Sequence, residues 1–240
     1  MKEVHFFYSP NAVAETQLPP DESLHALRVL RLKEGDEIYL LDGKGFFYNA
    51  VISMVASKKC FYEIKERLEQ EKTWKGWIHL AIAPTKSIDR IEWMVEKAVE
   101  VGVDEISFLN TRFTERNTIK TERIEKIVVA AVKQSRKAFM PKVNGMVSFD
   151  EFISREYSGR KFISHCYKEI PRIDLFERIY PSSKDDILVL VGPEGDFSFD
   201  EVTNACNMGY ESVTFGKSRL RTETAGLMAV VMANMALRKT

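Results

Sequence analysis

The feature that most constrains the fold is the apolar run Ile187–Val191 (ILVLV). A strand that lacks polar alternation is buried on both faces, as in the centre of a parallel sheet. Helical stretches separate this run from further strand candidates at 77–83, 105–109, 161–166 and 212–215. Because strands and helices alternate, the sequence predicts an α/β fold built on a parallel sheet.

Residues 1–72 show a different pattern. Two alternating apolar segments, Glu37–Leu41 and Phe46–Val55, flank the turn sequence Asp-Gly-Lys-Gly at 42–45. Asp-Gly between β-rich segments is a hairpin signal. A helix is expected at Ser23–Leu30. We therefore predict a small β domain at 1–72 and a larger α/β domain at 73–240.

The composition excludes several classes of protein. The chain has 35 basic and 35 acidic residues, three widely spaced cysteines, and no apolar run of 18 residues. The N-terminal sequence lacks the apolar segment of a secretory signal. We expect a cytoplasmic protein with reduced thiols and no membrane span. No Cys or His residues stand at zinc-ligand spacing, so no metal is expected.

The zero net charge hides one basic segment. Residues 111–142 carry nine Lys or Arg and three acids, a local charge of +6. Such a segment is typical of contact with nucleic-acid phosphates, although an isolated run of this kind is more often a solvated helix face. Residues 1–72 have 10 basic and 12 acidic residues, so any contact there must be a local patch.

Two glycine-containing loops stand at the expected carboxyl edge of the sheet, where ligands of open α/β sheets bind. The first is Val191–Phe197 (VGPEGDF), and the second is Phe215–Ala225 (FGKSRLRTETA). The second enters a helix, which Thr222 or Thr224 is expected to cap. Each loop also has a purely structural interpretation. The first could be a tight turn without a ligand, and the second could be a helix-capping motif with solvated charges. The Rossmann, phosphate-loop and serine-hydrolase motifs are absent.

Together the two loops resemble the RsmE family of 16S rRNA uridine-N3 methyltransferases. GPEG-x-F is followed about twenty residues later by Gly216 and LRTETA. The chain departs from the family pattern at Asp196, where a second Gly is usual, and at Ser218, where Arg is common. Other matching positions span nearly the whole chain: His25, 29–32 (VLRL), Gly35, Asp36, Lys86, Asp89, Lys97, Glu100, Gly102, Val103, Ile106, Gln134, Ser135 and Pro141.

The resemblance implies a SPOUT-type parallel sheet with a trefoil knot, preceded by a small PUA-like β-barrel. It implies that S-adenosylmethionine donates a methyl group to N3 of a specific uridine in 16S rRNA. It also implies a homodimer, in which the Ala/Met-rich helix at 222–237 packs across a two-fold axis.

The resemblance also assigns roles to residues. Arg221 would steer negative charge on the uracil, with Glu194 or Glu223 as proton acceptor or orienting group. Backbone and apolar groups of the two loops would hold the cofactor: His165, Leu190, Val191, Gly192, Pro193, Glu194, Gly195, Phe215, Gly216, Lys217, Ser218, Leu220, Arg221, Thr222, Thr224 and Ala225. RNA contacts would come from Arg28, Arg31, Arg112, Arg116, Lys133, Gln134, Arg136 and Lys137.

Two other functions stay open on the sequence alone. One is a SPOUT methyltransferase that acts on another RNA position, such as a ribose 2′-hydroxyl. The other is a non-catalytic RNA-binding factor of ribosome assembly. Binding of S-adenosylmethionine separates the last from the two enzymes.

Overall fold

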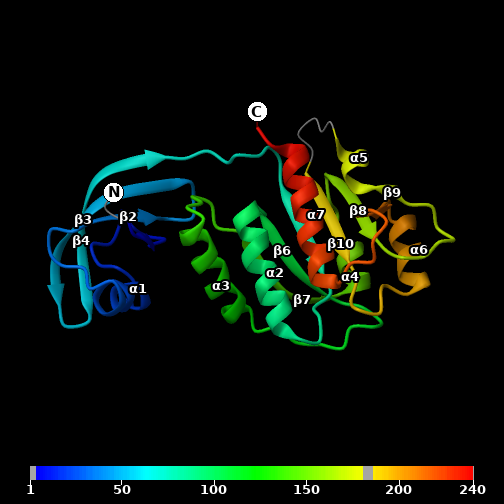
Figure 1. Cartoon of the computed structure of the whole chain (residues 1–240), viewed down its shortest axis with the longest axis horizontal. Coiled ribbons are helices and arrows are strands. Elements are labelled where there is room, and N and C mark those ends of the chain that lie inside the picture. Colours follow the sequence, from blue (N-terminus) through cyan, green and yellow to red (C-terminus); the bar gives the residue numbers. More distant parts are fainter. Residues whose placement is uncertain (1–3, 181–185, 240) are drawn as a thin grey trace. The chain divides into compact units, whose positions relative to one another are not determined.

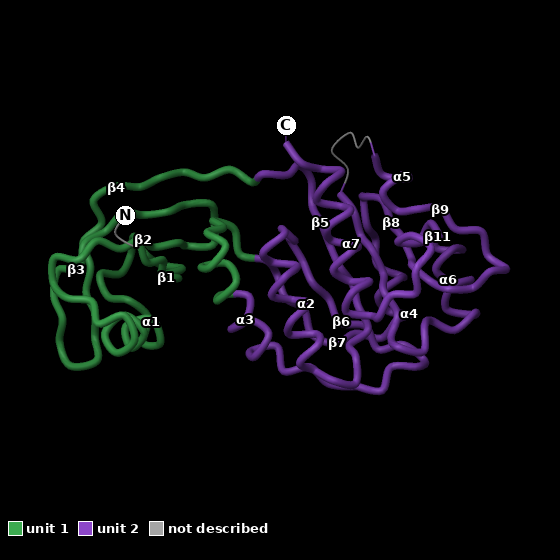
Figure 2. The backbone as a smooth tube through the Cα atoms, in the orientation of Figure 1, with its two compact units in different colours: residues 1–72, 129–140 green, residues 73–128, 141–240 purple. Residues whose placement is uncertain are grey.

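The computed structural model describes residues 4–180 and 186–239 (Figure 1). The chain forms two compact units (Figure 2). One comprises residues 1–72 with 129–140, and the other comprises 73–128 with 141–240. Helix α3, Thr121–Gln134, contributes its first half to the second unit and its second half to the first.

The first unit is built on a four-stranded sheet in the order β1-β2-β3-β4. The first two strands pair in parallel and the other pairs are antiparallel. The predicted helix is present as α1 (Pro20–Leu24), continued by a π-helical turn, His25–Val29. The strands are β1 (Phe6–Tyr8), β2 (Glu37–Leu41), β3 (Phe46–Ala56) and β4 (Lys59–Glu69).

The predicted hairpin between β2 and β3 is confirmed. The buried carboxylate of Asp42 accepts hydrogen bonds from the backbone N–H groups of Lys44 (2.7 Å) and Phe46 (3.2 Å), and from the hydroxyl of Tyr48 (3.0 Å). Residues 129–140 join this unit, because the Met140 N–H donates to the Gly43 carbonyl (2.9 Å). A segment distant in sequence therefore completes the β unit.

The second unit contains a seven-stranded sheet in the order β7-β6-β5-β10-β8-β11-β9, in which every pair is parallel. The α/β parallel sheet expected from the sequence is thus confirmed. The two central strands, β5 and β10, have all five residues buried. The strands are β5 (Ile78–Ile82), β6 (Glu105–Asn110), β7 (Lys142–Ser148), β8 (Arg160–Ser164), β9 (Ile173–Asp174), β10 (Ile187–Val191) and β11 (Glu211–Thr214).

Helices cover both faces of this sheet (Figure 1). On one face, α7 packs on α2, β5 and β10, and a Cβ on Gly226 would lie 2.8 Å from Ile82 Cδ1. On the other face, Ala81 and Ala83 belong to a core cluster with Phe149 of α4 and Val202 of α6. The helices are α2 (Ile88–Val101), α4 (Phe149–Ile153), α5 (Leu175–Ile179), α6 (Phe199–Asn207) and α7 (Thr222–Leu237).

The structure shows how α6 and α7 begin. A capping box of Ser198 and Glu201 opens α6. The expectation that Thr222 or Thr224 caps α7 is wrong, because Arg221 is the N-cap and makes no side-chain capping bond. Thr222 already has helical geometry as the first residue of the helix. The trefoil knot stays a prediction.

A buried polar network lies at the amino end of β5, β6 and β7. The His79 imidazole Nε2 is 2.8 Å from Ser107 Oγ, which also accepts from the Asn144 amide (2.8 Å). Glu105 is 4.0 Å from the same imidazole nitrogen. Burial lowers the pKa of His79 from 6.5 to about 4, although the Glu105 carboxylate acts in the opposite direction. The imidazole is therefore neutral at pH 7.

This pKa predicts a pH-dependent stability. Between pH 6.5 and about 4 the unfolded chain binds a proton at His79 that the folded chain does not bind, so stability falls as pH falls through that window. At about 1.4 kcal/mol per pKa unit, the free energy of unfolding drops by up to about 3 kcal/mol. Urea denaturation of His79→Gln between pH 7.5 and 4.5 should show a smaller loss of stability than that of the wild type. Equal slopes for the two proteins would contradict this explanation.

Candidate functional site

The predicted cofactor residues meet at one edge of the sheet of the second unit. Strands β10, β8 and β11 are neighbours and run in parallel, so the loops after their carboxyl ends lie side by side. These loops carry His165, Gly192–Gly195 and Phe215–Arg221. The sequence placed the three segments far apart, and the strand order brings them together.

The loop after β10 is tightly folded. A Cβ on Gly192 would lie 3.0 Å from the backbone nitrogen of Phe197, and one on Gly195 would lie 3.2 Å from Phe113 Cβ. The Asp196 N–H donates to the Pro193 carbonyl (3.0 Å), which closes a turn. Both glycines therefore stand where the backbone packs closely and a side chain would push neighbours aside.

The structure accommodates Asp196 at the position where the family pattern usually has glycine. Its φ of +68° lies in the left-handed region, which glycine adopts readily and Asp tolerates better than most residues. Its carboxylate accepts from the backbone N–H groups of Cys166 (2.7 Å) and Phe197 (2.8 Å). The side chain thus ties the loop after β10 to the loop after β8, a link that glycine cannot supply.

His165 presents two unsatisfied polar atoms at this edge. The side chain is 5% exposed, and both ring nitrogens are buried without a hydrogen-bond partner. Burial lowers its pKa, so the imidazole is neutral at pH 7 and has one donor and one acceptor to offer. Buried polar atoms without partners are destabilising, and a bound polar group would satisfy them. The cofactor role of His165 stays a prediction.

The Glu194 side chain is hydrogen-bonded to the backbone of a neighbouring loop. Its carboxylate accepts from the Lys86 N–H (3.0 Å), between β5 and α2. The carbonyls of Thr85 and Lys86 in turn accept from the Arg116 guanidinium (3.2 and 2.6 Å). Glu194 and Arg116 together fix the loop from which α2 starts.

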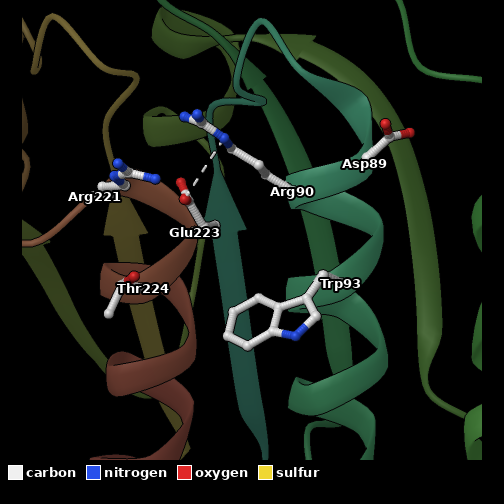
Figure 3. Close-up of a pocket in the computed structure, with 6 residues that line it drawn as sticks. All are labelled: Asp89, Arg90, Trp93, Arg221, Glu223 and Thr224. Atoms are coloured by element: carbon white, nitrogen blue, oxygen red, sulfur yellow. Dashed lines mark ion pairs between the residues drawn. The ribbon is translucent and has the colours of Figure 1, made fainter.

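A pocket of about 570 Å³ opens between the first turns of α2 and α7 (Figure 3). Three predicted residues line it: Arg221, Glu223 and Thr224. The other lining residues, Asp89, Arg90 and Trp93, come from α2. The spacing of Arg90 and Trp93 places them on one helix face, but only the three-dimensional fold brings that face to α7.

Glu223 is the most unusual group of this pocket. Its side chain is 9% exposed. One carboxylate oxygen lies 3.9 Å from Arg90 Nε, and the other is buried without a partner. The pocket thus combines two guanidinium groups with a carboxylate oxygen that has a free acceptor position.

The remaining predicted cofactor residues differ in exposure. Leu190 and Val191 of β10 and Gly192 and Pro193 of the following loop are buried. Glu194 and Gly195 are exposed. In the second loop, Gly216, Lys217, Ser218 and Arg221 are exposed, Phe215, Leu220, Thr224 and Ala225 are partly buried, and Thr222 is buried.

The predicted RNA-binding residues fall in both units. Arg112 and Arg116 belong to the second, while Arg28, Arg31, Lys133, Gln134, Arg136 and Lys137 belong to the first. The Lys133 ammonium contacts both carboxylate oxygens of Glu22 (2.7 and 2.9 Å). Within the basic segment, carboxylates from elsewhere also pair with Arg112, Arg123 and Lys142. These ion pairs therefore offset part of the +6 charge that residues 111–142 carry in the sequence.

The described part of the chain shows neither a cluster of metal-ligand residues nor a membrane-spanning helix. Residues 4–180 and 186–239 contain no group of three or more His, Cys, Asp or Glu that could hold a metal ion. No helix in these ranges is long and apolar enough to cross a membrane.

Comparison with known proteins gives two domain matches. A family model described as an RNA methyltransferase domain matches residues 72–234, and an RNA methyltransferase PUA domain matches residues 18–65. The ribosomal RNA small subunit methyltransferase E of Rickettsia conorii is 28% identical over 225 residues, covering 92% of this chain and 90% of the relative. That of Bacillus subtilis is 27% identical, covering 88% and 86%.

Solved structures share the fold over the whole chain. A probable rRNA methyltransferase from Porphyromonas gingivalis is 39% identical with a TM-score of 0.90, and 98% of each chain is covered. The ribosomal RNA small subunit methyltransferase E of Neisseria gonorrhoeae, bound to S-adenosyl methionine, is 27% identical with a TM-score of 0.85, covering 97% of this chain and 98% of the other. The N-terminal β domain and the α/β domain thus both have counterparts in these proteins.

Proposed function

This chain belongs to the RsmE family of small-subunit rRNA methyltransferases, and on that basis we propose that it methylates N3 of a uridine in 16S rRNA. It is an enzyme that transfers a methyl group from S-adenosylmethionine to small-subunit rRNA. The observation that best supports the finer proposal is the meeting of GPEG and LRTETA at one sheet edge. These two motifs carry the resemblance to uridine-N3 methyltransferases.

The cofactor site consists of the three loops at that edge. When bound, S-adenosylmethionine supplies the methyl group as an electrophile. We assign its binding to Leu190–Gly195, Phe215–Ser218, Leu220–Thr222, Thr224, Ala225 and His165. The unpaired ring nitrogens of His165 offer polar contacts. Asp196 keeps two of these loops together.

The uracil must lose its N3 proton, because a protonated imide nitrogen has no available lone pair. Of the two predicted proton acceptors, Glu194 already accepts from the Lys86 N–H, whereas Glu223 has an oxygen without a partner. We therefore favour Glu223 as the acceptor and Arg221 as the group that stabilises negative charge. The target base has to be unstacked from its neighbours to reach these residues.

RNA binding is proposed for exposed basic and polar side chains in both units, among them Arg28, Arg31, Arg112, Gln134 and Arg136. The PUA domain offers a surface that reads RNA by shape more than by net charge. Lys133 is a weaker candidate than its sequence position indicates, because a phosphate would have to compete with Glu22.

We also propose a homodimer, because α7 is apolar on more faces than its own unit covers. Gly226, Ala229, Val230 and Ala233 face the core, whereas Met235 is 50% exposed. Sedimentation should give a dimer at micromolar concentration, because paired copies would cover this apolar surface. A monomer under these conditions would contradict the proposal.

The proposed reaction can be tested with purified components. The protein is incubated with small-subunit RNA and S-adenosylmethionine carrying an isotopically labelled methyl group, and the RNA is digested to nucleosides. The label is expected in 3-methyluridine. Label in a 2′-O-methylated nucleoside would point to the alternative SPOUT activity, and binding of S-adenosylmethionine without transfer would leave the proposal unsupported.

A further inference from the structure

The pocket between α2 and α7 carries a pattern of hydrogen-bonding groups that the proposed reaction does not by itself require. Arg90 lies on one side of Glu223 and Arg221 on the other (Figure 3). Guanidinium groups only donate hydrogen bonds and an ionised carboxylate only accepts them. The three side chains therefore present donors, an acceptor and donors in sequence.

This order is complementary to one nucleobase edge. Uracil presents the acceptor O4, the donor N3–H and the acceptor O2, whereas cytosine presents a donor, an acceptor and an acceptor. We propose that Arg90, Glu223 and Arg221 read the Watson–Crick edge of the target uracil, with Glu223 on N3–H and the arginines on the two oxygens. This inference rests on the proposed function and adds Arg90 to its residues.

The burial of Glu223 supports a ligand at this place. An acceptor oxygen that is buried without a partner costs about 1–3 kcal/mol, more when it is charged. Arg90 Nε, at 3.9 Å, is too distant for a hydrogen bond to the other oxygen. The oxygen that faces Arg90 therefore makes no hydrogen bond either, and uracil N3–H is a donor of the kind that this carboxylate lacks.

The rest of the pocket suits a base that becomes negatively charged. The indole of Trp93 is 46% exposed and offers an aromatic wall of the kind on which bases stack. The first turns of α2 and α7 both open here, and helix N-termini favour negative charge. These features match an unstacked uracil on its way to an anion.

The same arrangement defines a proton transfer. The N3–H bond breaks, the proton moves to the Glu223 carboxylate, and the electron pair stays on the base. The negative charge spreads over N3, O2 and O4, where Arg90 and Arg221 stabilise it. The electron pair at N3 is then available to the methyl group.

The test is Glu223→Gln, which keeps the size of the side chain and an acceptor oxygen but cannot take the proton. We expect 3-methyluridine formation to be about 100-fold slower near pH 7. The rate of the variant should rise about tenfold per pH unit above pH 7, because solvent must then ionise the base, while the wild-type rate rises less. An RNA with 5-fluorouridine at the target, whose N3 proton is more acidic, should restore much of the rate.

Two further variants complete the experiment. Arg90→Ala should slow uridine methylation at least tenfold. Arg155→Ala, which removes an exposed arginine that follows α4 and pairs with Glu151, should have the wild-type rate. Calorimetry with S-adenosylmethionine checks that each variant is folded. A wild-type rate in Arg90→Ala would overturn this inference alone. A wild-type rate and pH profile in Glu223→Gln would overturn it together with the assignment of Glu223 as proton acceptor. Absence of 3-methyluridine with the wild-type enzyme would instead overturn the proposed function.

Discussion

Replacing Arg221 with alanine is expected to lower the rate of methyl transfer by about a thousandfold while the chain stays folded. The guanidinium group lines the pocket beside Glu223, where it can stabilise negative charge on the base. Its side chain makes no capping bond to α7, and its backbone has an ordinary φ of −73°. Alanine therefore removes the charge without removing a structural contact of the helix start.

The matched control is Arg219→Ala, an exposed arginine two residues earlier in the same loop and outside the pocket. It should retain most of the activity. Single-turnover rates with saturating S-adenosylmethionine measure both variants, and calorimetry reports cofactor binding. Equal losses in the two variants would show that loop charge in general, and not the position of Arg221, governs the reaction.

The second large effect concerns stability. Phe197 is fully buried at the end of the loop after β10, and its ring centroid lies 5.3 Å from that of Phe149. Phe197→Ala would leave a cavity between the loop and α4 and lower the free energy of unfolding by about 3–5 kcal/mol. Because this ring supports the loop with the GPEG sequence, affinity for S-adenosylmethionine should fall as well.

Phe199→Ala is the control for this substitution. Phe199 stands two residues later and is 48% exposed, with one edge-on ring contact to Tyr167. Its replacement should cost less than about 1 kcal/mol. Urea denaturation followed by circular dichroism measures both values. Similar losses for the two phenylalanines would contradict the packing described around Phe197.

Much of the fold could be predicted from local pattern. The apolar run Ile187–Val191 is β10 without any change of boundary, and the Ala/Met-rich segment Thr222–Leu237 is α7. The sequence did not reveal β7 (Lys142–Ser148), because its residues are only partly buried or exposed and show no apolar alternation. Nor did it show that residues 129–140 join the β unit, since that depends on contacts distant in sequence.

The site was predicted only in part. The loops at 190–197 and 215–225 stood out as motifs. Arg90 and Trp93, which lie on the amphipathic helix α2, belong to no motif that the sequence marks. Their importance comes from the packing of α2 against α7, which periodicity does not specify. Asp196 read as a departure from a pattern, and only its left-handed backbone and two hydrogen bonds explain why it is tolerated.

We propose that this enzyme forms 3-methyluridine in 16S rRNA. The most direct measurement is mass spectrometry of nucleosides from 16S rRNA of a strain that lacks the gene, beside its parent. We expect 3-methyluridine to be lost while other methylated nucleosides remain, and the intact gene to restore it. Retention of 3-methyluridine in the strain without the gene would contradict the proposed function.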